Sequence, residues 1–348
     1  DIYEPVQRGD VRFKKVRATD DGMEPMGNIV FKITDKNTGE FHYVVTDGNG
    51  EFSSKKVRET YGTADLNKNC IAYSEGDGSY TQGDISPNFG VWFTGSPVDD
   101  CAKMDRSDIK ADRGSFPYGT YIIEEMRCDA NKGYVLSKPQ EFTVKSNNEE
   151  VSLTDDFVNV PYPSLTTKAT HSVAKGAAAK VSDKVEVKWI KGDYTLKGIV
   201  MDKKTGKAAT DTKGNYITAV LPFSTEGNDY VRNDSKEMIF KDFDSTGMDS
   251  TYVIFEYLYE GTDTEELEVV NGMPDITGVM KDDAGNPICH ADIKNTDGSQ
   301  TFNVIRIKTK AFVDGDTGNN RIQATKRTKI SDTISYEGLT KGDKYTVK

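Results

Sequence analysis

The chain has 348 residues, of which 35% are hydrophobic, and its formal net charge at pH 7 is -11. A protein that binds nucleic acid needs a basic stripe, and the sequence has none, so the acidic balance argues against that class of partner. No apolar run is long enough to cross a membrane and no signal peptide is recognisable, while the length predicts two or three domains with modest cores.

Strand and turn patterns dominate the first part of the chain, and no segment keeps a sustained helical period. The opening segment 11–19 alternates, which places Val11, Phe13 and Lys15 on one face of a strand. Residues 28–52 then predict strands joined by Gly-containing turns. This part of the chain is therefore expected to be a sheet structure.

Residues from about 53 to 116 are irregular and rich in Gly, Asp and Ser. Such a stretch is too long for an ordinary loop, so it predicts an insertion with some structure of its own. Trp92 and Phe93 lie in it, and such aromatics form either a contact platform for a ligand or, more commonly, the small core of the segment. Strand patterns then resume, and Pro161 and Pro163 mark a linker.

Four cysteines are too few for a disulfide framework, and their spacings match no zinc site. Cys70, Cys101 and Cys128 lie in one region and could contain one bridge, or they are unpaired small apolar residues like Cys289. No metal and no cofactor is predicted.

Three polar residues occupy positions where the strand pattern expects an apolar side chain. They are Lys15, Glu125 and Asn159. Burial lowers the pKa of a lysine and so supplies a neutral, nucleophilic amine, while a protonated glutamate can polarise an amide. Attack would give a Lys–Asn isopeptide bond and release ammonia, although three unrelated strand-end polar groups would produce the same pattern. Alternative partners are Lys14 as the amine and Asp155 or Asp156 as acceptors.

Several segments of this region resemble the CnaB-type (SpaA-like, prealbumin-like) domain of Gram-positive pilins and adhesins. The matching segments are FKKV, VFKITDKNTG, VTDGNGEF, GTYIIEE, NKGYVL and FVNVP. The resemblance implies a β-sandwich in which Lys15 and Asn159 form the isopeptide bond with Glu125 as the catalytic acid. The insertion is a departure from simple members of that family.

An internal repeat follows the linker. LTTKA, VSDKVEV and KGDYTLK recur near the end of the sequence as IKTKA, ISDTISY and KGDKYTVK. Such a repeat is typical of modular arrays. The expected organisation is a domain at 1–162, a second at 163–306, and the start of a further repeat at 307–348 in a longer tandem protein.

A second reactive constellation is predicted in the repeat. Thr167 lies on an inward strand face, and a hydroxyl beside a histidine base and a side-chain amide is suited to acyl transfer. In this hypothesis His290 deprotonates Thr167, which attacks the amide of Gln300, while Glu256 and Asp297 hold the amide through a shared proton. Gln300 is interpreted as a strand residue that shares its face with Phe302 and Val304. The equivalent threonine of the second copy is Thr309.

This region resembles the VaFE-repeat, or Thr–Gln ester-forming, domain of Gram-positive surface proteins. The match rests on the L-x-T-x-A start, the SD and KGDYTLK segments, VIFE, and H-x-D-I followed by QT. The resemblance implies an ester between Thr167 and Gln300. The spacing between His290 and Gln300 is longer than usual, so Asp292 and Asp297 could exchange roles.

Together these features predict an all-β protein of tandem Ig-like or prealbumin-like β-sandwiches. The expected function is a structural stalk segment of an extracellular, cell-wall-attached adhesin, with single-turnover cross-linking and no enzymatic turnover. Peptidoglycan anchoring is expected to come from regions outside this sequence. A hydrolase site at His290, Asp292 and Glu256 is the enzymatic alternative, but the sequence lacks the usual hydrolase motifs. A module that binds a host ligand or glycan through Trp92 and Phe93 is the other alternative.

Overall fold

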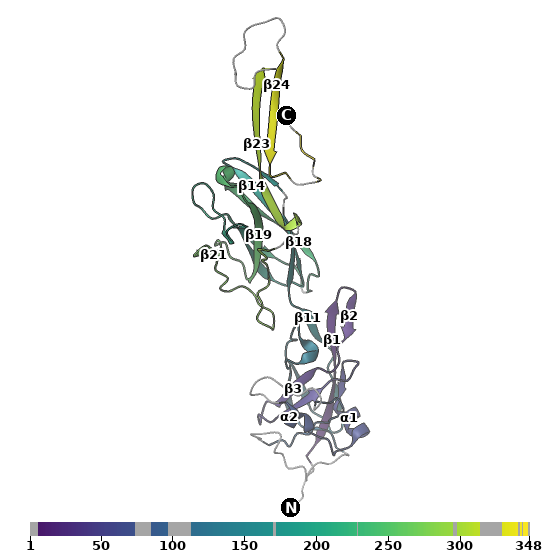
Figure 1. Ribbon diagram of the computed structural model, residues 1–348. Coiled ribbons are helices and arrows are strands. Elements are labelled where there is room, and N and C mark those ends of the chain that lie inside the picture. The colour runs from purple at the N-terminus through teal and green to yellow at the C-terminus, as the bar shows by residue number, and fades with distance from the viewer. Residues whose placement is uncertain are drawn as a thin grey trace, which may run out of the picture. The chain divides into compact units, whose positions relative to one another are not determined.

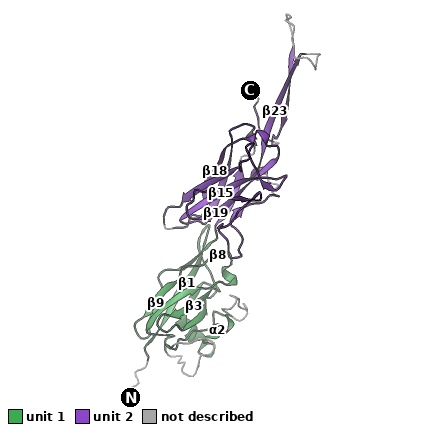
Figure 2. Cartoon of the chain, turned by 90° about the vertical axis from the view of Figure 1, so that its left-hand side faces the viewer, with its two compact units in different colours: residues 1–162 green, residues 163–348 purple. Residues whose placement is uncertain are grey.

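The chain divides into two compact units, unit 1 (Asp1–Tyr162) and unit 2 (Pro163–Lys348) (Figure 2). The computed structural model describes residues 6–73, 85–96, 113–169, 172–227, 229–294, 298–313, 329–339, 342 and 344–346. Strands make up most of the regular structure in both units, so the all-β prediction is confirmed.

One long strand, β1 (Arg8–Thr19), organises the first sheet of unit 1 (Figure 1). Its partners are β2 (Gly22–Pro25), β5 (Glu51–Ser53), β6 (Phe116–Pro117), β10 (Glu150–Ser152) and β11 (Phe157–Pro161), and β8 (Tyr134–Val135) pairs with β11. β1 and β11 run parallel with Lys15 opposite Phe157. This pairing brings the opening and closing strands of the unit side by side.

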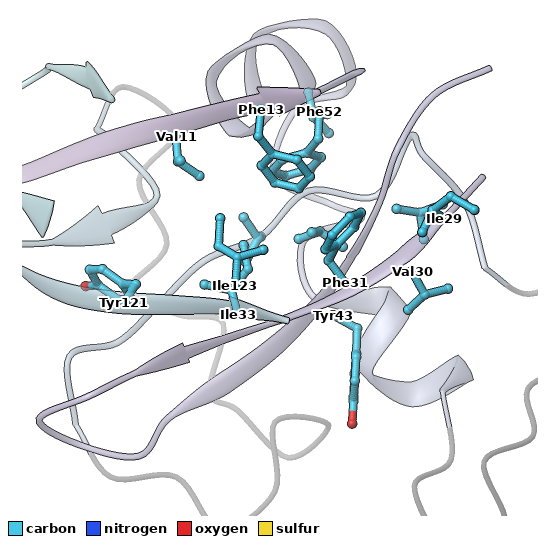
Figure 3. Packing of buried hydrophobic residues seen from close by; sticks show 14 of the residues in the cluster. Val11, Phe13, Ile29, Val30, Phe31, Ile33, Tyr43, Phe52, Tyr121 and Ile123 are labelled. Carbon is cyan, nitrogen blue, oxygen red and sulfur yellow. The ribbon is translucent and has the colours of Figure 1, made fainter. Parts of the chain in front are cut away.

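The second sheet of unit 1 has the strand order β4-β3-β7-β9. Its strands are β3 (Val30–Asp35), β4 (Phe41–Val45), β7 (Gly119–Glu125) and β9 (Gln140–Val144). The apolar faces of the two sheets meet in one core (Figure 3), in which the ring of Phe13 from β1 lies 4.8 Å from that of Phe31 and 5.2 Å from that of Phe157. Edge-on aromatic contacts of this kind add to the stabilisation from burial.

The insertion contains two short helices that the sequence did not predict, α1 (Ser54–Tyr61) and α2 (Lys68–Ala72). Ser53 caps α1 by accepting a hydrogen bond from the backbone of Lys56, and Gly62 ends it with a positive φ of 73°. Both helices are too short for a hydrophobic period to emerge from the sequence. A buried ion pair of 2.7 Å between Arg58 and Asp10 ties α1 to β1.

The insertion is also tied to β1 through Arg8, whose guanidinium is buried. It donates to the backbone oxygens of Gly114 (2.5 Å) and Phe93 (2.6 Å) and lies 3.6 Å from the ring centroid of Trp92. Burial is the main reason that the pKa of Arg8 falls to about 10. The insertion therefore belongs to the packed body of unit 1.

Unit 2 contains a three-stranded sheet, β12-β14-β18, and a larger sheet built on β13-β23-β19-β15-β16. The strands of the smaller sheet are β12 (Ser164–Ala169), β14 (Ala179–Lys188) and β18 (Asp234–Phe243). The larger sheet contains β13 (Ser172–Ala174), β15 (Asp193–Asp202), β16 (Lys207–Ala208), β17 (Thr218–Ser224), β19 (Thr251–Glu260), β22 (Cys289–His290) and β23 (Thr301–Val313). β20 (Val269–Val270) and β21 (Met273–Pro274) form a small separate ladder.

The strand β23 takes part in two structures. Its first residues pair with β19, and its later residues form a hairpin with β24 (Ile330–Glu337). Large apolar side chains of this hairpin are exposed, among them Ile307, Ile334 and Tyr336. None of the helices in the described part of the chain is long and apolar enough to cross a membrane.

Candidate cross-linking sites

Unit 1 brings Lys15, Glu125 and Asn159 together in its interior. The Lys15 ammonium nitrogen lies 2.5 Å from Asn159 Oδ1, 3.1 Å from the backbone oxygen of Phe157, and 3.2 Å from Glu125 Oε2. The Lys15 side chain is fully buried, with 0% exposure. Lys15 and Asn159 come from the paired strands β1 and β11, and the packing of the second sheet against the first brings Glu125 on β7 to them.

Burial lowers the pKa of Lys15 to about 8, although the nearby Glu125 carboxylate acts in the opposite direction. About a tenth of Lys15 is therefore a neutral amine at pH 7, and about half at pH 8. Lys14 is exposed on the opposite face of β1, and Asp155 and Asp156 are exposed as well. The structure brings none of these three alternatives into the buried site.

Glu125 is held by residues that the sequence did not single out. Its Oε1 accepts from Asn131 Nδ2 (2.9 Å) and Asn159 Nδ2 (2.6 Å), and its Oε2 accepts from the backbone N–H (2.8 Å) and hydroxyl (2.7 Å) of Ser137. Asn131 is itself buried. Asn131 and Ser137 are the first and last residues of the NKGYVLS segment that follows Glu125. Their polar character was the only feature of the sequence that could have indicated a role at this site.

Unit 2 brings Thr167, His290 and Gln300 together. The Thr167 hydroxyl lies 2.5 Å from Gln300 Oε1 and 3.2 Å from His290 Nδ1, and Gln300 Nε2 donates to the backbone oxygen of Thr167. Gln300 ends a short 3-10 turn (Gly298–Gln300) before β23 begins, so its interpretation as a strand residue is wrong. Phe302 and Val304, which follow in β23, are buried.

Glu256 contacts the same nitrogen of His290 as the Thr167 hydroxyl does. Glu256 and His290 face each other in the β19–β22 pair, and Glu256 Oε2 lies 3.2 Å from His290 Nδ1. Glu256 is completely buried, and this loss of solvent raises its pKa well above the ordinary value, with Asp183 as a further cause. Both causes favour the protonated form of Glu256, which can donate a proton.

Asp183 is the residue of this site that the sequence analysis missed. It lies opposite Ala169 in the β12–β14 pair, is 1% exposed, and has a pKa raised by burial. Within the described part of the chain, neither of its oxygens nor Glu256 Oε1 has a partner at hydrogen-bond geometry. Burial raises the pKa of both carboxyls, and the interaction with Asp183 raises that of Glu256 further, so ionisation of both at once is disfavoured. The sequence did contain an indication of Asp183, because the dipeptide SD recurs in both copies of the repeat.

The two aspartates named from the sequence do not contribute to the described site. Asp292 is exposed and caps its own turn by accepting from the backbone of Lys294. Asp297 lies outside the described residues. Among the described residues, Asp183 is the carboxyl whose interaction raises the pKa of Glu256.

Thr309 occupies the same strand position in the second copy as Thr167 in the first. In the first hairpin Thr167 lies opposite Val185 and Ala169 opposite Asp183; in the second, Thr309 lies opposite Ile334 and Ala311 opposite Asp332. Thr309 and Asp332 are exposed, whereas Thr167 and Asp183 are buried. The second copy thus has the register of the site without its enclosure.

Trp92 and Phe93 are buried, with 5% and 0% exposure, which leaves little surface for a ligand. Phe93 is part of the main core of unit 1 and Trp92 lies against Arg8 of β1, so the described residues do not favour a binding platform there. Among the described residues no group of three or more His, Cys, Asp or Glu side chains could hold a metal ion.

A family model described as "T-Q ester bond containing domain" matches residues 163–304 and again 305–348, together more than half of the chain. The search of curated proteins gave no match.

Solved structures of bacterial adhesins and pilins show weaker similarity. They include a Mobiluncus mulieris adhesin described as containing intramolecular disulfide, isopeptide and ester bond cross-links (20% identity, TM-score 0.25, 40% of this chain and 55% of that chain). The full-length major pilin SpaD from Corynebacterium diphtheriae has 13% identity, a TM-score of 0.26, and coverage of 85% of this chain and 77% of that chain. The RrgB pilus protein from Streptococcus pneumoniae has 9% identity, a TM-score of 0.31, and coverage of 75% and 50%. The chain thus spans about half the length of the Mobiluncus adhesin, and the family assignment rests on the sequence match alone.

Proposed function

Because this chain belongs to the family of T-Q ester bond containing domains, we propose that it is a structural stalk segment of a bacterial surface adhesin, closed in each unit by one self-formed side-chain bond. The bonds are a Thr167–Gln300 ester in unit 2 and a Lys15–Asn159 isopeptide in unit 1. The single observation that carries the proposal is the contact of 2.5 Å between the Thr167 hydroxyl and the Gln300 side chain, with His290 at 3.2 Å.

In the ester reaction the Thr167 hydroxyl gives its proton to His290 Nδ1, and its oxygen attacks the side-chain carbonyl carbon of Gln300. The proton shared by Glu256 and Asp183 stabilises the negative charge that develops on the Gln300 oxygen. The intermediate collapses when the amide nitrogen takes the proton from His290 and leaves as ammonia. One C–O bond forms and one C–N bond breaks, and no other reactant is needed.

In the isopeptide reaction the neutral amine of Lys15 attacks the side-chain carbonyl carbon of Asn159. Glu125, which contacts both groups, carries a proton from the lysine nitrogen to the leaving amide nitrogen. A bond forms between the Lys15 nitrogen and the Asn159 side-chain carbon, the bond from that carbon to the amide nitrogen breaks, and ammonia leaves. Each site is used once, because its nucleophile is consumed, which supports a structural role over enzymatic turnover.

The positions of the two bonds suit a stalk that carries tension. The isopeptide spans 144 residues of unit 1 and the ester spans 133 residues of unit 2. With both bonds in place, a pull along the chain passes from Lys15 to Asn159, through the linker to Thr167, and across to Gln300. The residues inside each loop lie outside that path, so unfolding cannot extend them.

Intact mass tests this proposal. A chain with both bonds is lighter than its sequence by two molecules of ammonia, and Thr167→Ala or Lys15→Ala each restores one. Treatment with hydroxylamine should open the ester and leave the isopeptide. A folded wild-type chain with the full sequence mass would contradict the proposal. Exposure of the chain on the surface of a bacterium is part of the same proposal and is testable by labelling intact cells.

A further inference from the structure

Unit 1 contains another nucleophile paired with a base, separate from the Lys15 site. Cys70 lies on α2 of the insertion, His42 on β4, and Glu40 just before β4. His42 Nδ1 lies 3.4 Å from Cys70 Sγ, and His42 Nε2 lies 2.8 Å from Glu40 Oε1. A thiol, an imidazole and a carboxylate are thus aligned in the order used by activated cysteines.

The hydrogen bonds to Glu40 decide which nitrogen of His42 carries the proton. Glu40 accepts from the backbone N–H (2.7 Å) and hydroxyl (2.9 Å) of Thr94 and from the backbone N–H of Gly95 (2.9 Å), so it is an ionised acceptor. Burial acts to raise the pKa of Glu40, but the bonds to His42 and Thr94 outweigh it and the pKa is lowered. His42 Nε2 therefore donates to Glu40, and the lone pair of Nδ1 faces the thiol.

The surroundings hold this arrangement in place. His42 and Glu40 are both 0% exposed, and the imidazole meets the ring of Phe93 edge-on with centroids 4.4 Å apart. Among the residues that the structure describes, Arg8 and Tyr121 also interact electrostatically with Glu40. Cys70 itself retains 7% of its surface, at the outer end of the alignment.

We propose that Cys70 is a reactive thiol that exchanges with an external disulfide, with His42 as its base and Glu40 as the carboxylate that orients His42. The thiol proton passes to His42 Nδ1 and the thiolate attacks one sulfur of the disulfide. The S–S bond breaks and a mixed disulfide with Cys70 forms. The released thiolate takes the proton from His42 and departs as a thiol, so Cys70 is oxidised and half of the disulfide is reduced.

The site fits a disulfide better than an acyl group. Acyl transfer needs N–H donors aimed at the developing oxyanion, and the nearby N–H groups of Thr94 and Gly95 are instead directed to Glu40. Disulfide exchange needs a thiolate and an acid for the leaving sulfur, and Cys70 with His42 supplies both.

The other cysteines of the described chain make the inference testable. Cys289 is more exposed than Cys70, but burial raises its pKa. Cys128 is 3% exposed and lies 3.9 Å from the backbone oxygen of Asn28. If exposure alone set reactivity, Cys289 would react first; if His42 activates Cys70, Cys70 would react first.

The experiment uses the full chain with Cys101→Ser, treated in the native state with hydroxyethyl disulfide over a range of pH and analysed by peptide mass mapping. We expect Cys70 to react at least about tenfold faster than Cys289 near neutral pH, with a half-maximal rate below the roughly 8.5 of an ordinary thiol. His42→Gln should abolish the difference, and Glu40→Gln should reduce it in a chain whose circular dichroism is unchanged. Reaction of Cys289 first, or reaction of Cys70 only after denaturation, would overturn the proposal.

Discussion

The two candidate cross-linking sites use different nucleophiles, an amine in unit 1 and a hydroxyl in unit 2. Each site supplies what its nucleophile needs in order to react. Lys15 only needs to lose a proton, and complete burial lowers its pKa to about 8 without a dedicated base. Burial cannot activate Thr167 in this way, because it disfavours the charged alkoxide. Unit 2 therefore supplies His290 at 3.2 Å from the hydroxyl. The comparison shows that an amine site needs a dry core and a hydroxyl site needs a base as well.

The two sites also differ in the surroundings of their acids, Glu125 and Glu256. Glu125 accepts several hydrogen bonds, from Asn131, Ser137 and Asn159 among others. Glu256 shares its enclosure with Asp183 and has a strongly raised pKa. In unit 1 hydrogen bonds hold the position of the acid, whereas in unit 2 burial and Asp183 favour the protonated form of the acid.

The largest expected effect comes from breaking one bond at a time under tension. Thr167→Ala should release the 133-residue loop of unit 2, which adds up to about 450 Å of extension at roughly 3.4 Å per residue in single-molecule pulling. Lys15→Ala should release the 144-residue loop of unit 1 in the same way. The wild-type chain should show neither step, and an unfolding step of either length in the wild type would refute the assignment of that bond.

Replacement of the acids should separate the two sites kinetically. Glu256→Gln removes the transferable proton and should slow ester formation by about 100- to 10,000-fold, with Asp183→Asn affecting the same reaction and neither affecting the isopeptide. Cell-free synthesis followed by mass against time measures both bonds in one sample. Glu265→Gln, an exposed glutamate of the same unit, is the matched control. Equal ester rates in Glu256→Gln and Glu265→Gln would exclude the proposed acid.

The rates of the two reactions should respond differently to rising pH. Because the pKa of Lys15 is lowered to about 8, its neutral fraction, and so the isopeptide rate, should rise about tenfold per pH unit below that value and then level off. Glu256 must keep its proton, so ester formation should decline as the pH rises through its raised pKa. Initial rates from synthesis at several pH values test this, and parallel profiles would contradict the distinction.

The sequence could predict the strands and the meeting of Lys15, Glu125 and Asn159, because strand alternation and a resemblance over six segments both identify inward positions. It could not predict α1 and α2, which are stabilised by Ser53, by Gly62 and by the Arg58–Asp10 ion pair and not by a hydrophobic period. Contacts made by tertiary pairing leave no local pattern for sequence analysis to detect.

Asp183 shows the same limit within the second site. Alternation in VSDKVEV marks an inward aspartate. The β12–β14 pairing places Asp183 opposite Ala169, two residues from Thr167, and tertiary packing brings Asp183 within reach of Glu256 on β19 of the other sheet. The expected acid, Asp297, lies near Gln300 in the chain, whereas Asp183 comes from β14, the strand beside β12. Proximity along the chain was a poor guide to proximity in the sheet.

A smaller effect is expected from the residues that position Glu125. Ser137→Ala removes the hydroxyl donor and Asn131→Ala removes an amide donor, and the loss of one hydrogen bond should slow isopeptide formation about 2- to 10-fold. Ester formation in the same chain is the internal control. Lys15→Arg sets the largest possible loss of isopeptide formation, because it should abolish the bond. An unchanged isopeptide rate in both variants would remove these residues from the site.

The smallest effect is expected at Thr309, although it has the same strand register as Thr167. Thr309→Ala should leave the intact mass deficit unchanged and alter the free energy of unfolding by no more than about 0.5 kcal/mol, because the side chain is exposed and opposite Ile334 in a hairpin that packs against little else. Thr167→Ala, by contrast, should restore one ammonia and remove a loop constraint of about 5 kcal/mol in the chain-entropy treatment. If Thr309→Ala raised the intact mass by one ammonia, a threonine and an aspartate at the strand positions of Thr309 and Asp332 would be sufficient for the reaction. The unchanged mass expected here would instead show that reactivity comes from enclosure by Glu256, His290 and Gln300, which only the first copy has among the described residues.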